Sequence, residues 1–243
     1  GDVYKRQEYS EVFAQLTDEN RNSLDEAALN SAKESVSEFI EKLDTVETDI
    51  VDSLGQPAFD FAKECAKTIY ACCEVQLSDN YNATRDQYMY EKVEWFLQHG
   101  DNTVLFINGH NGHIGKSSVG ELLSDNLGNG YYSIGTDAQE TQFNSQKGNG
   151  EFEVLEVSNS NDLNNQFSNA DNGQYFIDFA SATSDEVWEQ ILSSKQSITT
   201  LNVSLSGMQK MLKSAYTVTI TPQDIFDSMI VFQSVTPSTI LSE

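Results

Sequence analysis

Two histidines share a glycine-rich stretch whose residue types suit a hydrolytic loop. His110 and His113 are two of the three histidines in this 243-residue chain, and both lie in GHNGHIGKSS, residues 109–118. A neutral imidazole can take a proton from water near pH 7. The N-terminus of a following helix offers free N–H groups that can hold a developing oxyanion. This pattern predicts that His110 and His113 are catalytic residues of a hydrolytic histidine loop.

Two other interpretations of the same stretch stay open. A phosphate-binding loop requires G-x-x-x-x-G-K-S/T, and Gly115-Lys116-Ser117 supplies its end, but His110 occupies the place of the leading glycine. This interpretation predicts a nucleotide-binding protein. A metal site would combine His110 and His113 with Asp or Glu, yet both lie in a loop and no third His or Cys ligand is suggested nearby. We expect neither a metal nor a cofactor.

The elements that position this stretch divide the chain in two. Residues 8–98 are typical of a helical segment, and residues 99–243 of an alternating strand-and-helix part of the same catalytic domain. The expected fold class is therefore α/β with a mostly parallel sheet, in an incomplete domain, and ligands should bind at the C-terminal ends of strands. The histidine stretch falls at such a place, because an apolar run precedes it and the capping pair Ser118 and Glu121 follows it.

Hydrophobic periodicity and turn residues predict the individual elements. Helices are expected over residues 8–20, 23–54, 58–77, 85–98, 184–192 and 207–214, with a short one at Pro222. Strands are expected over residues 103–108, 130–135, 152–157, 174–179 and 229–235. Residues 136–150 and 158–173 are rich in Asn, Gln, Ser and Gly and are expected to be loops.

Composition restricts the partners of the chain. The net charge is −24 and the pI is near 4.2, which disfavours nucleic acid and anionic membrane surfaces as partners. No apolar run reaches the roughly 18 residues that a membrane span needs. Cys65, Cys72 and Cys73 lie at helical spacing without a CxxC pair, so we expect buried, reduced thiols. The acidic composition and unpaired cysteines favour the cytoplasm.

The first residues do not look native. GDVYKRQ, residues 1–7, begins abruptly without an initiator Met and resembles adapter-derived sequence. We therefore expect a C-terminal fragment whose natural start, with any secretion signal, is missing. This expectation leaves the compartment open between the cytoplasm and secretion, and the oligomeric state is open too.

Several motifs together resemble those of the erythromycin esterase family. RDQYM, residues 85–89, resembles the RDxxM helix of that family, and GHNGH, residues 109–113, resembles its AHNxH loop after a strand. GELL (120–123), YSIG (132–135) and FDSMIVFQSVTPS (226–238) resemble its later motifs. Each motif alone is weak, but the helix and the loop together are fairly specific.

The resemblance covers about residues 56–240 and implies a bacterial hydrolase that opens a small-molecule ester or lactone with activated water and without a metal. No GxSxG motif is present, which agrees with a mechanism lacking a serine nucleophile. Carried onto this chain, the motif residues are His110 and His113 as catalytic residues, with Arg85, Glu91 and Asn111 as substrate-binding or supporting residues.

Two departures from the family pattern matter. Gly109 replaces the alanine of the family loop, which is a minor change. The family also places a Glu and a His in a GExxHG-like N-terminal strand end, and that His is the expected general base. No histidine precedes His99, which lies at a helix end and is expected to be a C-terminal cap. We therefore expect His110 and His113 to bind substrate or stabilise the transition state, and the fragment alone to show little catalysis.

A non-enzymatic binding module on the same fold is the main alternative to a hydrolase. In that case the acidic, Asn-rich loops over residues 136–172 would carry recognition.

Overall fold

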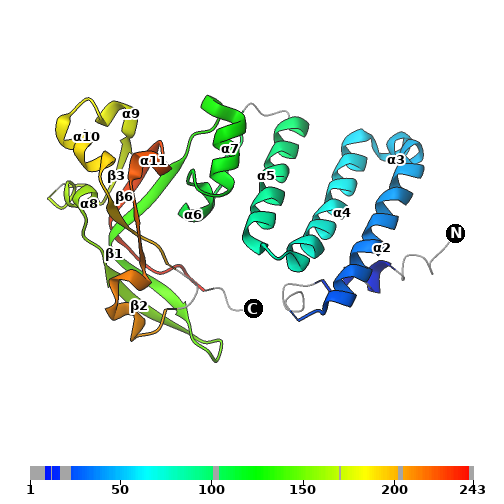
Figure 1. The fold of residues 1–243 in the computed structure, drawn as a ribbon, viewed down its shortest axis with the longest axis horizontal. Coiled ribbons are helices and arrows are strands. Elements are labelled where there is room, and N and C mark those ends of the chain that lie inside the picture. The colour runs from blue at the N-terminus through cyan, green and yellow to red at the C-terminus, as the bar shows by residue number, and fades with distance from the viewer. Residues whose placement is uncertain are drawn as a thin grey trace. The chain divides into compact units, whose positions relative to one another are not determined.

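The computed structural model describes residues 9–11, 13–16, 23–100, 104–169, 171–201 and 205–240. The chain forms two compact units, Gly1–Phe106 and Ile107–Glu243, and the described strands all belong to the second (Figure 1). The expected α/β class with a helical N-terminal part is confirmed. The expectation that residues 1–7 are not native falls outside the described residues.

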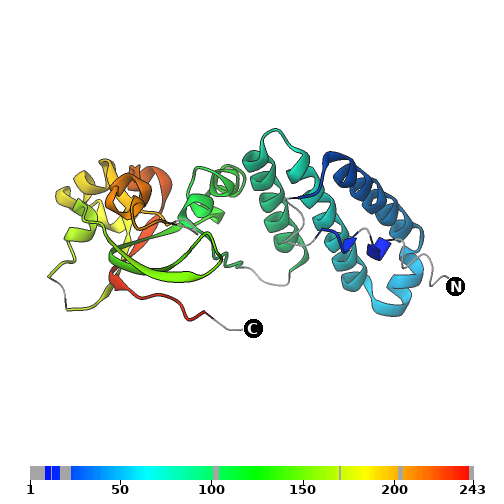
Figure 2. The same cartoon turned by 90° about the horizontal axis from the view of Figure 1, so that it is seen from below.

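The helical unit is a row of antiparallel helices. It contains α2 (Glu26–Thr45), α3 (Glu47–Leu54), α4 (Gln56–Leu77) and α5 (Tyr81–His99). The α4 helix packs between α2 and α5 (Figures 1 and 2). The helix expected over residues 23–54 is two helices, because the backbone leaves helical geometry at Val46, with φ −115° and ψ 14°. Gly55 then has a φ of 86°, a conformation open to glycine, and ends α3.

One side of each long helix is buried. Leu29, Ala32 and Val36 of α2 recur at helical spacing and are almost fully buried, as are Phe59 and Ala66 of α4. None of the described helices combines the length and hydropathy that crossing a bilayer would require.

The cysteines of α4 differ in burial. Cys73 is buried and Cys72 is half-buried, but Cys65 is exposed, so the expectation of buried thiols is wrong for Cys65. All three are free thiols. One helix turns its residues towards all sides, so helical spacing alone does not make all three face the interior.

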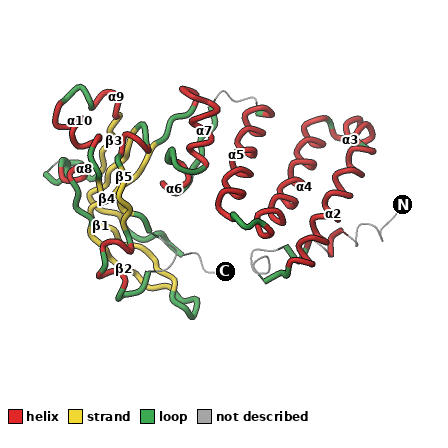
Figure 3. Tube along the Cα trace, viewed as in Figure 1, coloured by secondary structure: helices red, strands yellow, loops and turns green. Residues whose placement is uncertain are grey.

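The sheet of the second unit is mixed. Its order is β2 (Phe152–Ser158), β1 (Ile134–Gln146), β6 (Ser228–Val235) and β3 (Gln174–Asp178). In the described part of the chain only β1 and β6 run parallel, so the mostly parallel sheet expected from the sequence is wrong. A short turn joins β1 to β2, which forces these two strands to be antiparallel. Separately, β4 (Gln196–Thr199) pairs antiparallel with β5 (Thr217–Ile220) (Figure 3).

Several predicted elements are confirmed and others are not. The strands expected over 152–157, 174–179 and 229–235 are β2, β3 and β6, and the helix over 184–192 is α10 (Glu186–Ser193). A short helix, α11 (Pro222–Ile225), begins at Pro222. Residues 104–110 are not in a strand, and the helix expected over 207–214 is two 3-10 turns, Gln209–Met211 and Lys213–Ala215.

The largest error concerns β1. Residues 136–146 were expected to be part of a loop, but they belong to the longest strand described. Gly135, Asp137, Thr141 and Ser145 are buried at odd-numbered positions, which is the two-residue period of a strand. Because most of these residues are polar, their alternation gives no hydrophobic signal.

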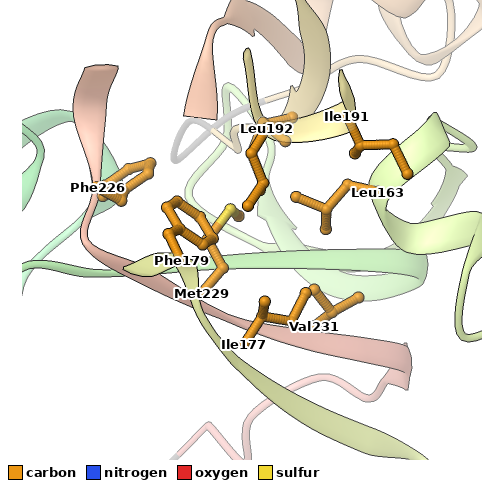
Figure 4. Packing of buried hydrophobic residues seen from close by; sticks show 9 residues of the cluster. Leu163, Ile177, Phe179, Ile191, Leu192, Phe226, Met229 and Val231 are labelled. Atoms are coloured by element: carbon orange, nitrogen blue, oxygen red, sulfur yellow. The ribbon is translucent and has the colours of Figure 1, made fainter. Parts of the chain in front are cut away.

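A hydrophobic cluster fixes the sheet against its helices. Leu192 of α10 and Leu163 of α8 (Asp162–Asn165) are fully buried and lie over Met229 and Val231 of β6 (Figure 4). The cluster also contains Ile177, Phe179, Ile191, Ile198 and Phe226. The buried apolar side chains of β3 and β6 therefore belong to this cluster, which holds the sheet against α8 and α10.

Candidate active site

The histidine loop enters a single helical turn, α6 (Asn111–Ile114), and His110 is its N-cap. The ring nitrogen Nδ1 of His110 accepts a hydrogen bond from the backbone N–H of Gly112 at 3.1 Å. A neutral imidazole has one donor and one acceptor nitrogen. Because Nδ1 is the acceptor, the neutral His110 ring carries its proton on Nε2.

The Nε2 atom of His110 lies 3.2 Å from the hydroxyl oxygen of Thr200. With the proton on Nε2, the imidazole donates to this hydroxyl. In this tautomer His110 is therefore a hydrogen-bond donor, which suits stabilisation of negative charge on a substrate oxygen better than removal of a proton from water.

Asn111 attaches the loop to the sheet. Its side-chain amide donates to the carbonyl oxygen of Thr136 at 2.7 Å, and its amide oxygen accepts from the N–H of Thr136 at 3.0 Å. These are the two bonds that a neighbouring strand would make to one residue of β1. Asn111 thus positions His110 beside the strand.

His113 is half-buried within α6, and its backbone N–H donates to the carbonyl oxygen of His110 at 2.8 Å. The short helical turn therefore fixes the backbone spacing between the two histidines.

A cavity of about 280 Å³ opens beside His110. Its walls are Gly109, His110, Asn111, Thr136, Asp137, Ala138, Thr141, Thr199, Leu201, Phe232 and Val235. His110 and Asn111 thus share one cavity, whose wall does not include His113 in the described part of the chain. Pockets that enclose a whole drug-sized ligand usually measure about 300–1,000 Å³, so this cavity has room for one group of a larger substrate.

Asp137 is a cavity residue that the sequence reasoning missed. It is only 3% exposed, and its carboxylate accepts three hydrogen bonds. The donors are the backbone N–H of Thr199 at 3.0 Å and the side-chain amides of Asn161 at 2.8 Å and Asn164 at 3.0 Å. Nothing in the residue types distinguishes Asp137 from the other 37 of the chain's 38 acidic residues; only the tertiary contacts reveal it.

The Asn-rich segment after β2 is structural at its buried positions. Asn159, Asn161 and Asn164 are at most 8% exposed, and Asn161 and Asn164 form a capping box that opens α8. The side chains of Asn161 and Asn164 point inward to Asp137, and that of Asn159 donates to the Ser197 carbonyl oxygen. These three side chains therefore do not provide the exposed recognition loop that the binding-module alternative requires.

Glycine lets a helix approach the loop. A Cβ atom on Gly120 of α7 (Val119–Leu127) would lie 2.2 Å from the carbonyl oxygen of Gly115 and 2.5 Å from that of Ile114. The same Ile114 carbonyl accepts a hydrogen bond from the Tyr131 hydroxyl at 2.5 Å. Burial raises the pKa of Tyr131, with a smaller contribution from the charge of Asp227, so the hydroxyl keeps its proton and donates.

Lys116 is bound to an acidic partner within the fold. Its ammonium lies 2.6 Å from Oδ1 of Asp227, while Oδ2 of Asp227 accepts from the N–H and hydroxyl of Ser133 at 2.8 and 3.0 Å. Burial alone would raise the pKa of Asp227, but the hydrogen bonds from Lys116 and Ser133 outweigh it and lower that pKa. Lys116 therefore joins the loop to the start of β6, a geometry that favours a structural role over phosphate binding.

Arg85 and Glu91 lie in the other unit. Both are on α5 and line a cavity of about 570 Å³ within the helical unit, whose aromatic lining residues are Tyr70, Tyr81, Tyr88 and Trp95. Glu91 is exposed at the cavity margin and accepts from the side-chain amide of Gln87 at 2.9 Å. Arg85 and Glu91 therefore line one cavity, and His110 and Asn111 line the other.

His99 lies at the C-terminal end of α5. Its Nδ1 atom is 2.9 Å from the carbonyl oxygen of Trp95, and its ring stacks on the Trp95 ring with a centroid distance of 4.6 Å. This geometry is that of the helix-end role expected from the sequence. Among the described residues, no three His, Cys, Asp or Glu side chains gather as a metal site.

Three solved structures share the fold of this chain. A Bacillus cereus protein is 23% identical with a TM-score of 0.75, and the match covers 97% of this chain and 60% of that protein. A succinoglycan biosynthesis protein is 14% identical with a TM-score of 0.73, covering 96% of this chain and 59% of that protein. An erythromycin esterase, EreC, solved as a histidine-to-asparagine mutant in its open conformation, is 12% identical with a TM-score of 0.62, covering 94% and 60%.

This chain spans about 60% of the length of each of these proteins. No protein of curated function matches it significantly. The sequence model of erythromycin esterase matches residues 2–235, nearly the whole chain, which agrees with the resemblance carried by the RDxxM helix and the histidine loop. The chain therefore belongs to the erythromycin esterase family.

Proposed function

We propose that this chain contributes the oxyanion-binding loop of a hydrolase that cleaves a small-molecule carboxylic ester or lactone with water. Family membership supports a hydrolase-like function. The observation that carries the finer proposal is the His110 ring in the cavity wall, whose Nδ1 accepts from Gly112 and whose Nε2–H therefore donates to the Thr200 hydroxyl.

The reaction adds water to the carbonyl carbon of the ester. The carbonyl oxygen becomes an oxyanion, and Nε2–H of His110 donates to it in place of the Thr200 hydroxyl. The bond between the carbonyl carbon and the alcohol oxygen then breaks, which yields a carboxylic acid and an alcohol. We assign His113 as a second group on the same loop. Arg85 and Glu91 stay proposed substrate-binding or supporting residues within the cavity of the helical unit.

Activation of the water needs a general base that accepts its proton. With its proton on Nε2 and its Nδ1 engaged by Gly112, His110 does not suit that role. We propose that the base belongs to the part of such proteins that this chain does not span, given that it covers about 60% of its solved relatives. The isolated chain should then hydrolyse esters only weakly.

The test supplies the base from solution. The 243-residue chain is assayed with 4-nitrophenyl esters, with and without free imidazole as the external base. We expect hydrolysis that needs imidazole and saturates with ester, and a loss of about 100-fold in kcat for His110→Gln, as for other oxyanion donors. His99→Gln, at the end of α5, is the matched histidine control and should keep full activity. Equal rates for the parent chain and His110→Gln would refute the proposal.

A binding module is the second candidate, and one observation favours it. The cavity of the helical unit, at about 570 Å³, is large enough for a whole small ligand and combines Arg85 with aromatic walls. The variant Trp188→Phe leaves Trp95, which lines this cavity, as the remaining one of two tryptophans. Saturable quenching of Trp95 by an ester that is never hydrolysed, unchanged in His110→Gln, would favour binding over hydrolysis.

A further inference from the structure

Two consecutive residues of β1 hold both members of the His110–Thr200 pair. Thr136 binds Asn111, the residue after His110, through two hydrogen bonds of 2.7 and 3.0 Å. Asp137 binds the N–H of Thr199, the residue before Thr200, at 3.0 Å. The spacing between the imidazole and the hydroxyl is therefore set by one dipeptide of a single strand.

The segment around Thr200 has further anchors. The hydroxyl of Thr199 donates to the carbonyl oxygen of Ala138 at 3.2 Å, and the N–H of Thr200 donates to the carbonyl oxygen of Tyr216 at 2.9 Å. Backbone and side-chain bonds to β1 and to Tyr216, the residue before β5, thus leave the Thr200 hydroxyl directed at His110.

All three hydrogen-bonding groups around the Asp137 side chain are donors, so a carboxylate fits this position and an amide does not. The amide oxygens of Asn161 and Asn164 each accept a backbone N–H, at 2.8 and 3.0 Å, within their capping box. This arrangement turns both NH₂ groups towards Oδ2 of Asp137, while Oδ1 receives the N–H of Thr199. An asparagine at position 137 would place its own NH₂ group against one of these donors.

A buried carboxylate held by neutral amides costs desolvation free energy that an apolar residue would not. The bonds it makes are directional, however, and one of them ends on the segment that carries the partner of His110. The Asp137 carboxylate therefore serves to fix the position of Thr200 relative to His110.

We propose that Thr200 and Asp137 are positioning residues for His110: the Gly112 N–H keeps the imidazole proton on Nε2, the Thr200 hydroxyl accepts the hydrogen bond from Nε2–H and so orients the ring, and Asp137 holds Thr200 in place. This inference rests on the proposed role of His110 as an oxyanion donor, and it adds two residues to that site. When substrate arrives, its carbonyl oxygen replaces Thr200 as the acceptor, so the ring is already oriented and no proton has to move between its nitrogens.

The readout is the ¹⁵N chemical shift of Nε2 in the His110 ring, which depends on the hydrogen bond that Nε2–H makes and is measured by long-range ¹H–¹⁵N correlation NMR. The chain has only three histidines, so His110→Gln assigns the His110 ring by loss of its signals. We expect the pattern of the Nε2–H tautomer in all variants, with an Nε2 shift in Thr200→Val displaced from that of the parent chain because the acceptor is gone, and restored in Thr200→Ser, which keeps the hydroxyl. Asp137→Asn should reproduce the change seen in Thr200→Val. Thr219→Val, at an exposed position of β5, is the matched control and should change nothing.

Unchanged His110 signals in Thr200→Val, or restoration absent in Thr200→Ser, would overturn the role of Thr200. Unchanged signals in Asp137→Asn would overturn the role of Asp137. If Asp137→Asn fails to fold by circular dichroism, Asn161→Ala, which removes one donor from the same carboxylate, takes its place with the same two outcomes.

Hydrolysis separates this inference from the proposed function. In the imidazole-dependent assay, Thr200→Val should lower kcat about tenfold with KM within twofold, because the ring geometry changes and the cavity walls do not. The expected changes in the Nε2 shift in a chain that hydrolyses no ester would refute the proposed function and support the positioning contacts. Hydrolysis that depends on His110, with identical imidazole spectra in all variants, would support the proposed function and refute the positioning roles of Thr200 and Asp137.

Discussion

The Nε2 atom of His110 lies 3.2 Å from the hydroxyl oxygen of Thr200, although 90 positions separate the two residues in the chain. Strand β1 brings them together, because Asn111 binds Thr136 and Thr199 binds Asp137. The attachment of Asn111 to this strand therefore helps to hold the loop that carries the histidines in position.

Asn111→Ala should detach the histidine loop from β1. The N–H and carbonyl groups of Thr136 lose partners at 3.0 and 2.7 Å, and water replaces them only in part. We expect a loss of about 1–2 kcal/mol in the free energy of unfolding, together with faster amide hydrogen exchange across α6. Asn126→Ala is the control, since the Asn126 amide donates within its own helix, to the carbonyl oxygen of Leu122. Equal exchange rates in α6 for both variants would contradict the role of Asn111.

Gly120→Ala should displace α7 from the loop. The added Cβ would meet the Gly115 and Ile114 carbonyl oxygens at 2.2 and 2.5 Å, and both are backbone atoms that move only with the loop. Overpacking of this kind costs about 1–3 kcal/mol. Thermal unfolding of Gly120→Ala and Gly148→Ala measures the effect, because Gly148 has open space around its Cβ position. A melting temperature for Gly120→Ala equal to that of Gly148→Ala would show that the close approach does not exist in solution.

The Lys116–Asp227 pair should make the free energy of unfolding depend on pH in the acidic range. The pKa of Asp227 in the folded chain lies below its ordinary value, so its contribution is fully present above about pH 5 and is lost as the pH falls through about 4 towards the folded-state pKa. We expect Asp227→Asn to cost about 1–3 kcal/mol at pH 7 and much less near pH 3. Urea unfolding of both chains across this range measures the difference. A difference that stays constant from pH 7 to pH 3 would disprove the assignment.

The three thiols should react in order of exposure and thiolate content. Burial, with a smaller effect of Cys72, raises the pKa of the Cys73 thiol to about 11, whereas Cys65 is exposed. At pH 8 the folded chain should be alkylated by iodoacetamide at Cys65 first and at Cys73 only after unfolding in urea. Peptide mass spectrometry over time gives the order, and Cys65→Ser should remove the fast phase. Early labelling of Cys73 in the folded chain would contradict its burial in α4.

Local sequence patterns were sufficient for much of the fold. The apolar alternation in residues 152–157, 174–179 and 229–235 predicted three strands correctly, because each strand buries one face by its own side chains. Asp185 caps α10 and Pro222 starts α11, and both signals act within one turn of helix. The spacing of His110 and His113 and the RDxxM motif also indicate the family to which the chain belongs.

Tertiary structure decided the rest. The polar residues of β1 form a strand because β6 and β2 supply its backbone hydrogen bonds, and no local pattern encodes those partners. Strand direction followed the turn between β1 and β2, so the sheet is mixed. Asp137 and Thr200 look like ordinary loop residues in the sequence, and they reach the histidine site only through contacts that span 62 and 90 positions. The sequence by itself thus determined which residues could do chemistry. The folded chain determined which nitrogen of His110 carries the proton, because that choice depends on hydrogen-bond partners that only folding brings within reach.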